Sequence, residues 1–196
     1  MNAFARLGLP RKAALSAEEI RSAFQQAGAA LHPDAATDGA DRLQRTAAFT
    51  ALNDAHSILL SLPRRLRHLL ELEYSDLAVQ KTGAVLGDRM MALFSITGSA
   101  VQRATAVQTK KQSAGSALAK AMLASEEMQA QESLEAATQE IEAARSTLEA
   151  ELASLDDARA AGIPTGQALQ SCAARAGFLE KWHAQLRAAF AGFFSA

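Results

Sequence analysis

The sequence predicts an all-α protein, with a helical hairpin near the N-terminus followed by an elongated antiparallel helical hairpin or three-helix bundle. Strong helix formers, mainly Ala, Leu, Gln, Glu and Arg, fill the chain of 196 residues. Aromatic residues make up only 5% of it, and no segment shows the alternation of apolar and polar residues that a strand needs. Apolar residues instead recur three and four positions apart, as they do on one face of a helix.

The first two predicted helices have clear start and stop signals. Residues 2–7 form a short helix that ends at Gly8. The second helix begins at Ser16, which can form a capping box with Glu19. It ends at about Leu31, because a proline two positions further on pushes the intervening residue out of the helical region.

Two more helices complete the N-terminal part. One spans about residues 40–60 and carries an apolar stripe, and a short amphipathic helix covers residues 64–73. Residues 74–87 lose the helical pattern and are predicted to be a linker. We therefore expect an N-terminal domain at residues 1–73 and a separate helical domain at residues 88–196.

The second domain is predicted to contain three helices. The first covers residues 88–108, a long one covers about 116–161, and the last begins at Thr165 or Gly166. In the long helix, apolar residues recur every seven positions, at Leu134, Ile141, Leu148 and Leu155. The second seam position is filled by Ala137, Ala144 and Leu152. Such a heptad pattern favours close packing against a neighbouring helix.

Composition argues against several classes of function. The formal net charge of −1 gives neither the basic footprint of a nucleic-acid-binding protein nor a polybasic patch for membranes. No stretch approaches the roughly 18 apolar residues of a membrane helix, and the first residues do not resemble a secretory signal. We therefore expect a cytoplasmic protein.

Chemistry by the chain itself is not expected either. The single cysteine, Cys172, cannot form an internal disulfide or a structural zinc site, and we expect it to be a small buried apolar residue. His56 and His68 are predicted to serve packing, and His183 to be a hydrogen-bonded polar residue of a helix seam, so no metal or other cofactor is expected. No nucleophile lies in a recognisable pattern with a base, so the protein is not expected to be an enzyme.

The tripeptide His32-Pro33-Asp34 stands where the second helix is predicted to end. Proline fixes the chain direction and removes a backbone donor, so the helix stops abruptly. The imidazole of His32 and the carboxylate of Asp34 would then be presented at the mouth of a loop. A carboxylate accepts hydrogen bonds only and suits an arginine of a partner. The tripeptide alone is weak evidence, and the pattern around it carries the argument.

That pattern resembles the J-domain of DnaJ-type co-chaperones over about residues 2–72. The family combines an aromatic residue and a Leu-Gly pair, a capped helix that ends in His-Pro-Asp, and a third helix with Phe, aliphatic and Ala positions. The matching residues here are Phe4, Leu7, Gly8, Ser16, Ile20, Phe24, His32, Pro33, Asp34, Phe49, Leu52, Ala55 and Leu59. The resemblance implies that the chain docks on a DnaK-type (heat shock 70 kDa) chaperone and stimulates its ATPase.

A narrower resemblance is to the HscB-type co-chaperones, which assist iron–sulfur cluster transfer. The segment LNDAHSILLSLPRRLRHLLELE is similar to the same region of that family, and a helical domain of about a hundred residues follows in both. The residues at comparable positions are Asn53, Ala55, Pro63, Arg65, Leu69, Leu70 and Leu72. This resemblance implies an iron–sulfur assembly scaffold as the client.

The chain departs from the J-domain pattern on its second helix, which usually presents several basic residues to the acidic chaperone. Arg21 is kept, but Ser22, Gln25 and Gln26 stand where basic residues are common. We therefore expect weaker electrostatic steering toward the chaperone, which nearby basic residues would partly restore. The residues predicted to contact the chaperone are His32, Pro33, Asp34, Arg21, Arg42 and Arg45.

The second departure concerns the client. The HscB type carries an acidic, leucine-rich motif early in its second domain, whereas this chain has Met90, Met91, Leu93 and Phe94 with almost no acid. These four residues are the candidate client-binding patch, with core packing as the other interpretation. The near absence of acidic residues in this patch leaves open whether the client is an iron–sulfur scaffold or another protein. A further alternative is a J-like structural protein whose heptad helix drives self-association into a homodimer.

Overall fold

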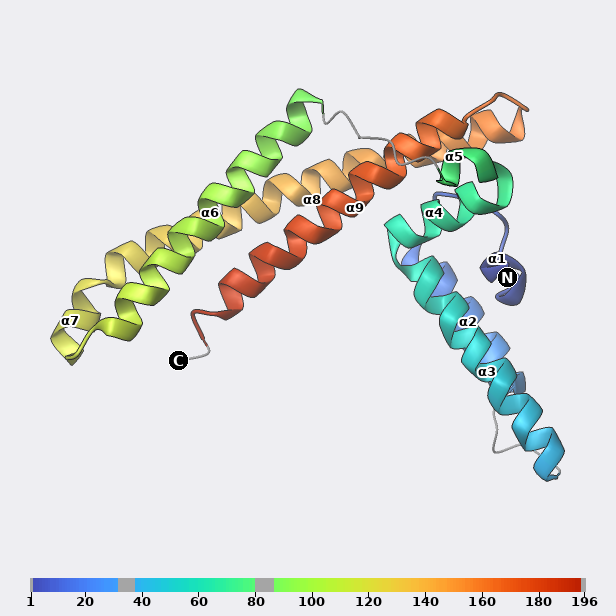
Figure 1. Ribbon diagram of the computed structural model, residues 1–196, viewed down its shortest axis with the longest axis horizontal. Coiled ribbons are helices and arrows are strands. Elements are labelled where there is room, and N and C mark those ends of the chain that lie inside the picture. Colours follow the sequence, from blue (N-terminus) through green and yellow to red (C-terminus); the bar gives the residue numbers. More distant parts are fainter. Residues whose placement is uncertain (1, 32–37, 80–86, 195–196) are drawn as a thin grey trace. The chain divides into compact units, whose positions relative to one another are not determined.

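The computed structural model describes residues 2–31, 38–79 and 87–194, and all regular structure in these ranges is helical. The helices are shown in Figure 1. Their bounds are α1 Ala3–Arg6, α2 Ala17–Leu31, α3 Gly39–Leu60, α4 Leu62–Glu73, α5 Ser75–Val79, α6 Asp88–Ser113, α7 Ala117–Met122, α8 Ala124–Ala160 and α9 Gly166–Ala191. The prediction of an all-α protein is confirmed.

The chain forms two compact units, and α8 and α9 contribute to both. The first unit comprises Met1–Gly83 and Glu149–Ala174, and the second comprises Ala84–Leu148 and Arg175–Ala196. The two units therefore do not follow the order of the sequence, because the end of α8 and the start of α9 pack with the N-terminal part of the chain. The division into functional domains at residues 1–73 and 88–196 stays a prediction.

The start of α2 is the predicted capping box. The hydroxyl of Ser16 accepts the backbone N–H of Glu19 at 3.1 Å, and the carboxylate of Glu19 accepts the backbone N–H of Ser16 at 2.7 Å. The side-chain and backbone hydrogen bonds of Ser16 lower the pKa of Glu19 below its ordinary value. This contribution to stability is therefore present above the ordinary carboxyl pKa and is lost as the pH falls through the lowered value.

The helices α2 and α3 pack together as a hairpin (Figure 1). Its core contains Ile20, Leu52, Ala55 and Leu59, each at most 2% exposed. The ring of Phe24 lies between α3 residues, 6.4 Å from Phe49 and 4.3 Å from the imidazole of His56. The prediction that His56 serves packing is consistent with this stack.

The helices α1 and α4 are joined by a buried histidine. The Nε2 atom of His68 accepts the backbone N–H of Ala3 at 3.0 Å, so the ring proton must reside on Nδ1, which lies 3.5 Å from Glu71. The ring also stacks on Phe4, with centroids 5.9 Å apart. His68 therefore combines packing with a hydrogen bond that fixes the N-terminal helix.

Part of the predicted linker at 74–87 is helical. The helix α5 covers Ser75–Val79, and the side chain of Gln170 donates to the carbonyl oxygen of Leu77 at 2.7 Å. Gly166 allows this approach, because a Cβ atom there would lie 2.7 Å from Leu77 Cδ1 and 2.8 Å from Tyr74 Cδ1. The helix is only five residues long, too short to show an amphipathic period, so the sequence pattern did not indicate it.

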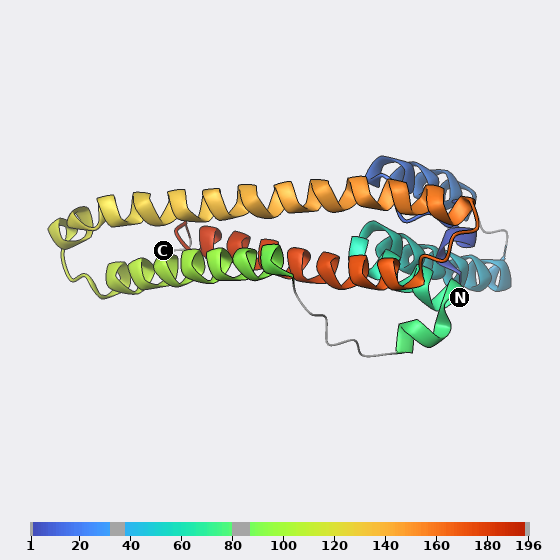
Figure 2. The same cartoon turned by 90° about the horizontal axis from the view of Figure 1, so that it is seen from above.

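In the second unit, α6 runs antiparallel to α8 and beside α9 (Figures 1 and 2). Ion pairs and a hydrogen bond set the register, since Arg89 bonds Glu140, Arg103 donates to Ser133 and Lys111 bonds Glu127. The buried side chains from these helices include Leu93, Ala100, Ala104, Leu134, Ile141, Leu148, Leu179 and Leu186. The antiparallel helical architecture is confirmed.

One long helix was predicted for residues 116–161, but the chain makes two helices there. Ser116 caps α7, its hydroxyl accepting the backbone N–H of Ala119, and α7 ends at Met122. The amide of Leu123 bonds to Lys120, and α8 begins at the next residue. The prediction of an unbroken helix from 116 was therefore wrong at its first turns, although the heptad seam lies wholly on α8.

Candidate functional site

The three motif residues His32, Pro33 and Asp34 lie outside the described residues. The structure describes the helices on either side of them, which are the arms of the α2–α3 hairpin. The helix α2 ends at Leu31, the residue directly before His32, as the sequence predicts. Arg21 on α2 and Arg42 on α3 have exposed side chains.

Arg45 differs from the other two predicted contact residues because its side chain is engaged within the hairpin. Its Nε atom donates to both carboxylate oxygens of Asp41 at 3.0 Å, and its Nη1 atom donates to the carbonyl oxygen of Ala30 at 3.1 Å. Asp38 is the N-cap of α3, and its Oδ1 atom accepts a hydrogen bond from the backbone N–H of Asp41 at 2.8 Å. Polar contacts thus tie the last turn of α2 to the first turns of α3.

The candidate client patch divides into two pairs of side chains. Met90 and Leu93 are buried, with 6% and 1% of their surface exposed, so they belong to the core of the second unit. Met91 and Phe94 are half exposed and are the members that a partner could reach. Because a helix turns about 100° per residue, Met91 and Phe94 share one side of α6. Core packing therefore describes Met90 and Leu93, and client binding by Met91 and Phe94 stays a prediction.

An aromatic cluster supports the exposed pair. The ring of Phe94 lies 6.1 Å from Trp182 of α9, and Trp182 lies 5.6 Å from Phe178 on the same helix. Trp182 is only 3% exposed, so it anchors α9, and its ring packs against the ring of Phe94. This burial leaves little of the Trp182 side chain for a partner to reach.

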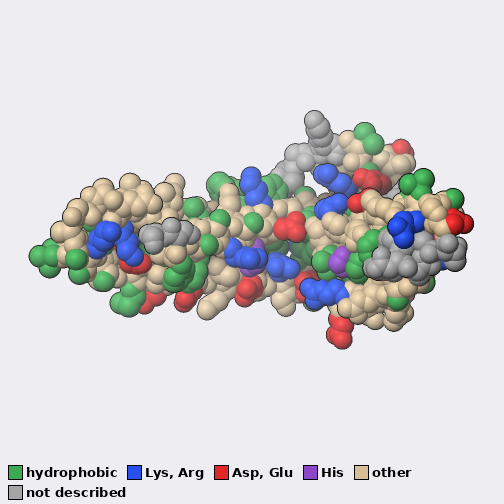
Figure 3. All heavy atoms as spheres, turned by 90° about the horizontal axis from the view of Figure 1, so that it is seen from below, with side chains coloured by type: hydrophobic (Ala, Val, Ile, Leu, Met, Phe, Trp, Pro, Cys, Tyr) green, Lys and Arg blue, Asp and Glu red, His purple; other side chains and the backbone are tan. Residues whose placement is uncertain are grey.

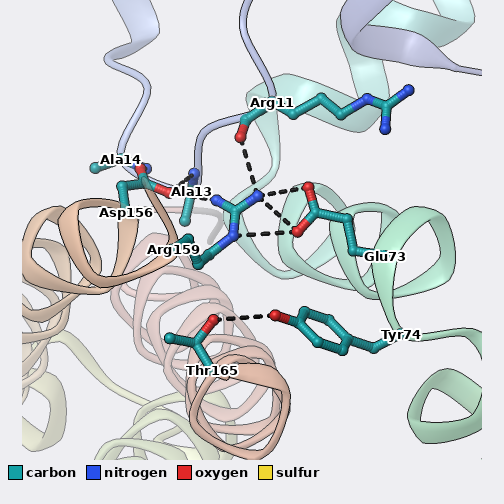
Figure 4. Close-up of polar contacts among 8 residues, drawn as sticks. All are labelled: Arg11, Ala13, Ala14, Glu73, Tyr74, Asp156, Arg159 and Thr165. Atoms are coloured by element: carbon teal, nitrogen blue, oxygen red, sulfur yellow. Dashed lines mark hydrogen bonds and ion pairs between the residues drawn. The ribbon is translucent and has the colours of Figure 1, made fainter. Parts of the chain in front are cut away.

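A polar cluster in the first unit was missed by sequence reasoning (Figure 4). Both oxygens of Asp156 on α8 accept backbone N–H groups, from Ala13 and from Ala14, each at 2.9 Å. Arg159, one turn further along α8, donates to Asp156 at 2.6 Å and to both carboxylate oxygens of Glu73. The cluster therefore holds the loop before α2 and the end of α4 to the end of α8.

Electrostatics within the cluster favours the charged form of Arg159. Burial of the Arg159 guanidinium works against its charge, but the hydrogen bonds and charge of Glu73, with those of Asp156, outweigh it and raise the pKa of Arg159 above its ordinary value. The sequence offered no signal for this cluster, because Ala13, Ala14 and Glu73 lie more than 80 residues from Asp156 and Arg159.

Arg65, one of the residues that carried the HscB-type resemblance, is buried at 6% exposure. Its Nη1 atom donates to the carbonyl oxygen of Leu59 at the end of α3. Burial lowers the pKa of the guanidinium below its ordinary value, and the nearby carboxylates of Glu149, Asp156 and Glu19 oppose that shift. The contact ties α3 to α4, so Arg65 has a structural role in this fold.

Asp156→Asn is expected to lower the free energy of unfolding by about 1 to 3 kcal/mol, because a side-chain amide has one acceptor oxygen and must turn its NH₂ group toward Ala13 or Ala14. Urea unfolding followed by circular dichroism measures the change. The exposed neighbour provides the control, since Asp157→Asn removes the same charge without touching these amides and is expected to cost under about 0.5 kcal/mol. Equal effects of the two changes would contradict the assigned role.

Other kinds of site find little support among the described residues. No group of three or more His, Cys, Asp and Glu side chains in residues 2–31, 38–79 and 87–194 is arranged to hold a metal ion. Basic and acidic side chains are interspersed on the face drawn in Figure 3. Within the part of the chain that the structure describes, none of the helices has both the length and the apolarity to cross a membrane. Cys172 is fully buried, as predicted.

The fold and the hairpin define a class: an all-α protein with a J-domain-like hairpin, α2 and α3, in which the motif His-Pro-Asp follows α2 directly. Sequence comparison points to the same class. The chain is 33% identical over 91 residues to the "Co-chaperone protein HscB homolog" of Chromobacterium violaceum, a match that covers 45% of this chain and 52% of that protein. The chain thus matches about half the length of this curated relative. No protein-family model matches the chain.

Structural comparison covers nearly the whole chain. The solved structure of chaperone HscB from Vibrio cholerae aligns with a TM-score of 0.62 over 96% of each chain, at 21% sequence identity. At that identity the likeness shows a shared fold. The resemblance to HscB-type co-chaperones that the sequence motifs indicated is therefore confirmed, both in sequence and in fold.

Proposed function

We propose that this protein is a J-type co-chaperone that stimulates the ATPase of a DnaK-type heat shock 70 kDa chaperone. The observation that carries the proposal is the place of His32-Pro33-Asp34 in the sequence, directly after α2 and before α3, two helices that pack as a J-like hairpin. The names of both similar proteins, a co-chaperone and a chaperone, agree with it.

In this role the chain performs no chemistry. The chaperone hydrolyses ATP, and the co-chaperone contributes a coupling free energy by binding the hydrolysis-competent state more tightly. His32 and Asp34 would supply polar atoms to the chaperone, and the exposed guanidinium groups of Arg21 and Arg42 would meet its acidic surface. No cofactor is needed, and a cytoplasmic location stays a prediction.

The proposal is tested by single-turnover ATP hydrolysis of a DnaK-type chaperone with increasing amounts of the full-length protein. We expect a saturable increase in the hydrolysis rate, because docking shifts the chaperone toward its hydrolysis-competent state. A rate that does not change at any concentration would reject the co-chaperone function. The measurement also separates the two candidate functions, since a purely structural protein would not alter hydrolysis.

We further propose that the exposed pair on α6, Met91 and Phe94, forms part of a client-binding surface, with an iron–sulfur assembly scaffold as the first client to test. Apolar side chains that are half exposed and supported by a buried Trp182 can bury area against a partner without moving the core. The proposal rests on this geometry and on the HscB-type resemblance.

Met91→Glu is expected to weaken binding of an iron–sulfur scaffold protein by about tenfold or more, because it places an unpaired charge in an apolar contact. Wild-type binding should depend little on salt, since Met91 and Phe94 offer no charge to screen. Calorimetric titration of the full-length protein at low and high salt measures both effects. Met128→Glu is a matched control, because the side chain of Met128 is also apolar and exposed but lies on α8.

Strongly salt-dependent binding that survives Met91→Glu would contradict the apolar surface and indicate an ionic interface elsewhere on the chain. Absence of binding at both salt concentrations would reject the scaffold as client.

The self-association alternative loses its main support in the structure. The heptad residues Leu134, Ile141 and Leu148 are at most 2% exposed in the single chain, so this seam is already covered by the chain's own helices. A homodimer would have to use another surface.

A further inference from the structure

The hairpin carries a polar clamp made by Asp38, Asp41, Arg45 and the carbonyl group of Ala30. A helix leaves its last four carbonyl groups without partners inside the helix, and a positive charge near them is favourable. The last turn of α2 contains no basic residue of its own. Arg45, on the neighbouring helix α3, provides the missing cation by donating to the carbonyl oxygen of Ala30.

The other half of the clamp fixes Arg45 itself. Both oxygens of the Asp41 carboxylate accept from Nε, and this i,i+4 pair is about a quarter exposed on each side chain. Asp38 in turn holds the backbone of Asp41 at the N-terminus of α3. A continuous series of contacts therefore runs from the start of α3 to the end of α2.

The two ends joined by the clamp are the ends of the segment that contains the motif. Ala30 lies two residues before His32, and Asp38 lies four residues after Asp34. We propose that Arg45 is a positioning residue, which fixes the distance between the two helix ends and so presents His32-Pro33-Asp34 to the chaperone. This inference rests on the proposed function, and it gives Arg45 a different role from the direct chaperone contact expected from the sequence.

Arg45→Gln tests the proposal in the full-length protein, and Arg42→Gln is the matched control. Arg42 is three residues away on the same helix and exposed, and it makes none of the clamp's side-chain hydrogen bonds. Both changes remove one positive charge near the motif. Only Arg45→Gln opens the clamp.

The first measurement is amide hydrogen exchange in peptides covering residues 29–41, without any chaperone. Arg45→Gln should accelerate exchange there, because the helix ends open more often, whereas Arg42→Gln should not. Arg45→Lys should fall between wild type and Arg45→Gln, since one ammonium group keeps the ion pair but lacks the planar fork that reaches both partners. Unchanged exchange in Arg45→Gln would overturn the proposal.

The second measurement is ATPase stimulation of a DnaK-type chaperone at low and high salt. Arg45→Gln should raise the half-saturating concentration by about three- to tenfold, the factor that one or two net hydrogen bonds correspond to, with an unchanged maximum. The increase should persist at high salt because the clamp is internal, while any effect of Arg42→Gln should fade. An Arg45 effect that disappears at high salt would indicate a direct contact and overturn the positioning role.

The two measurements separate the inference from the function on which it rests. If the wild-type protein gives no ATPase stimulation, the proposed function fails, and hydrogen exchange alone then decides whether Arg45 holds the helix ends together.

Discussion

His32→Gln is expected to abolish stimulation of a DnaK-type ATPase while leaving the helical circular dichroism unchanged. The substitution replaces a rigid ring with two nitrogen atoms by a flexible amide, so hydrogen bonds made by the imidazole to a partner are lost. The fold is expected to survive, because α2 ends at Leu31 and the hairpin core lies at Ile20, Leu52, Ala55 and Leu59.

The control variant introduces a glutamine just beyond the motif. Ala35→Gln adds an amide in the same segment but leaves His32, Pro33 and Asp34 intact, so it should retain stimulation. Retained stimulation in His32→Gln would reject the assignment of the motif as the recognition element. Loss in both variants would show that the whole segment tolerates no added amide, and the role of His32 would then have to be read from His32→Ala.

Leu148→Ala is expected to lower the free energy of unfolding by about 2 to 5 kcal/mol, the range measured when a buried leucine is cut to alanine. Leu148 lies on the heptad seam of α8 and is 2% exposed. Truncation removes the transfer free energy of the side chain and leaves a cavity that the packed helices around it cannot fill completely. Urea unfolding monitored by circular dichroism measures the loss.

Leu118→Ala provides the matched comparison, because Leu118 is 74% exposed on α7 in the same compact unit. The same atoms are removed from a side chain with little buried surface, so a change within about 0.5 kcal/mol is expected. A loss under about 0.5 kcal/mol in Leu148→Ala would mean that the seam is not packed as the structure has it.

Local signals in the sequence were sufficient for most of the helices. The capping box of Ser16 and Glu19, and the proline after His32, set the ends of α2, because caps and proline act within one turn of the chain. The heptad of Leu134, Ile141 and Leu148 predicted a buried seam, since periodicity depends only on helix geometry. The same signals failed at Leu123, where α7 gives way to α8 within a run of good helix formers.

Only part of the candidate site could be predicted from the sequence. The motif at 32–34 is recognised by its neighbours in the sequence and lies outside the described residues. Among the basic residues, Arg42 and Arg45 look equivalent in the sequence, yet only the second reaches the carbonyl group of Ala30. In the run from Met90 to Phe94, residue type alone could not separate the buried from the exposed members, because their side of α6 depends on which helices pack against it.

The sequence by itself determined the class of the fold, the helix ends that carry caps or prolines, and the resemblance that points to a co-chaperone. All of these depend on residues close together in the chain. Tertiary structure alone decided that Asp156 would bind the amides of Ala13 and Ala14, and that Gly166 would face Tyr74 and Leu77. These pairs are separated by more than 80 residues, so no local propensity or periodicity encodes them. They form only when packing of the folded chain brings residues that are distant in the sequence next to one another.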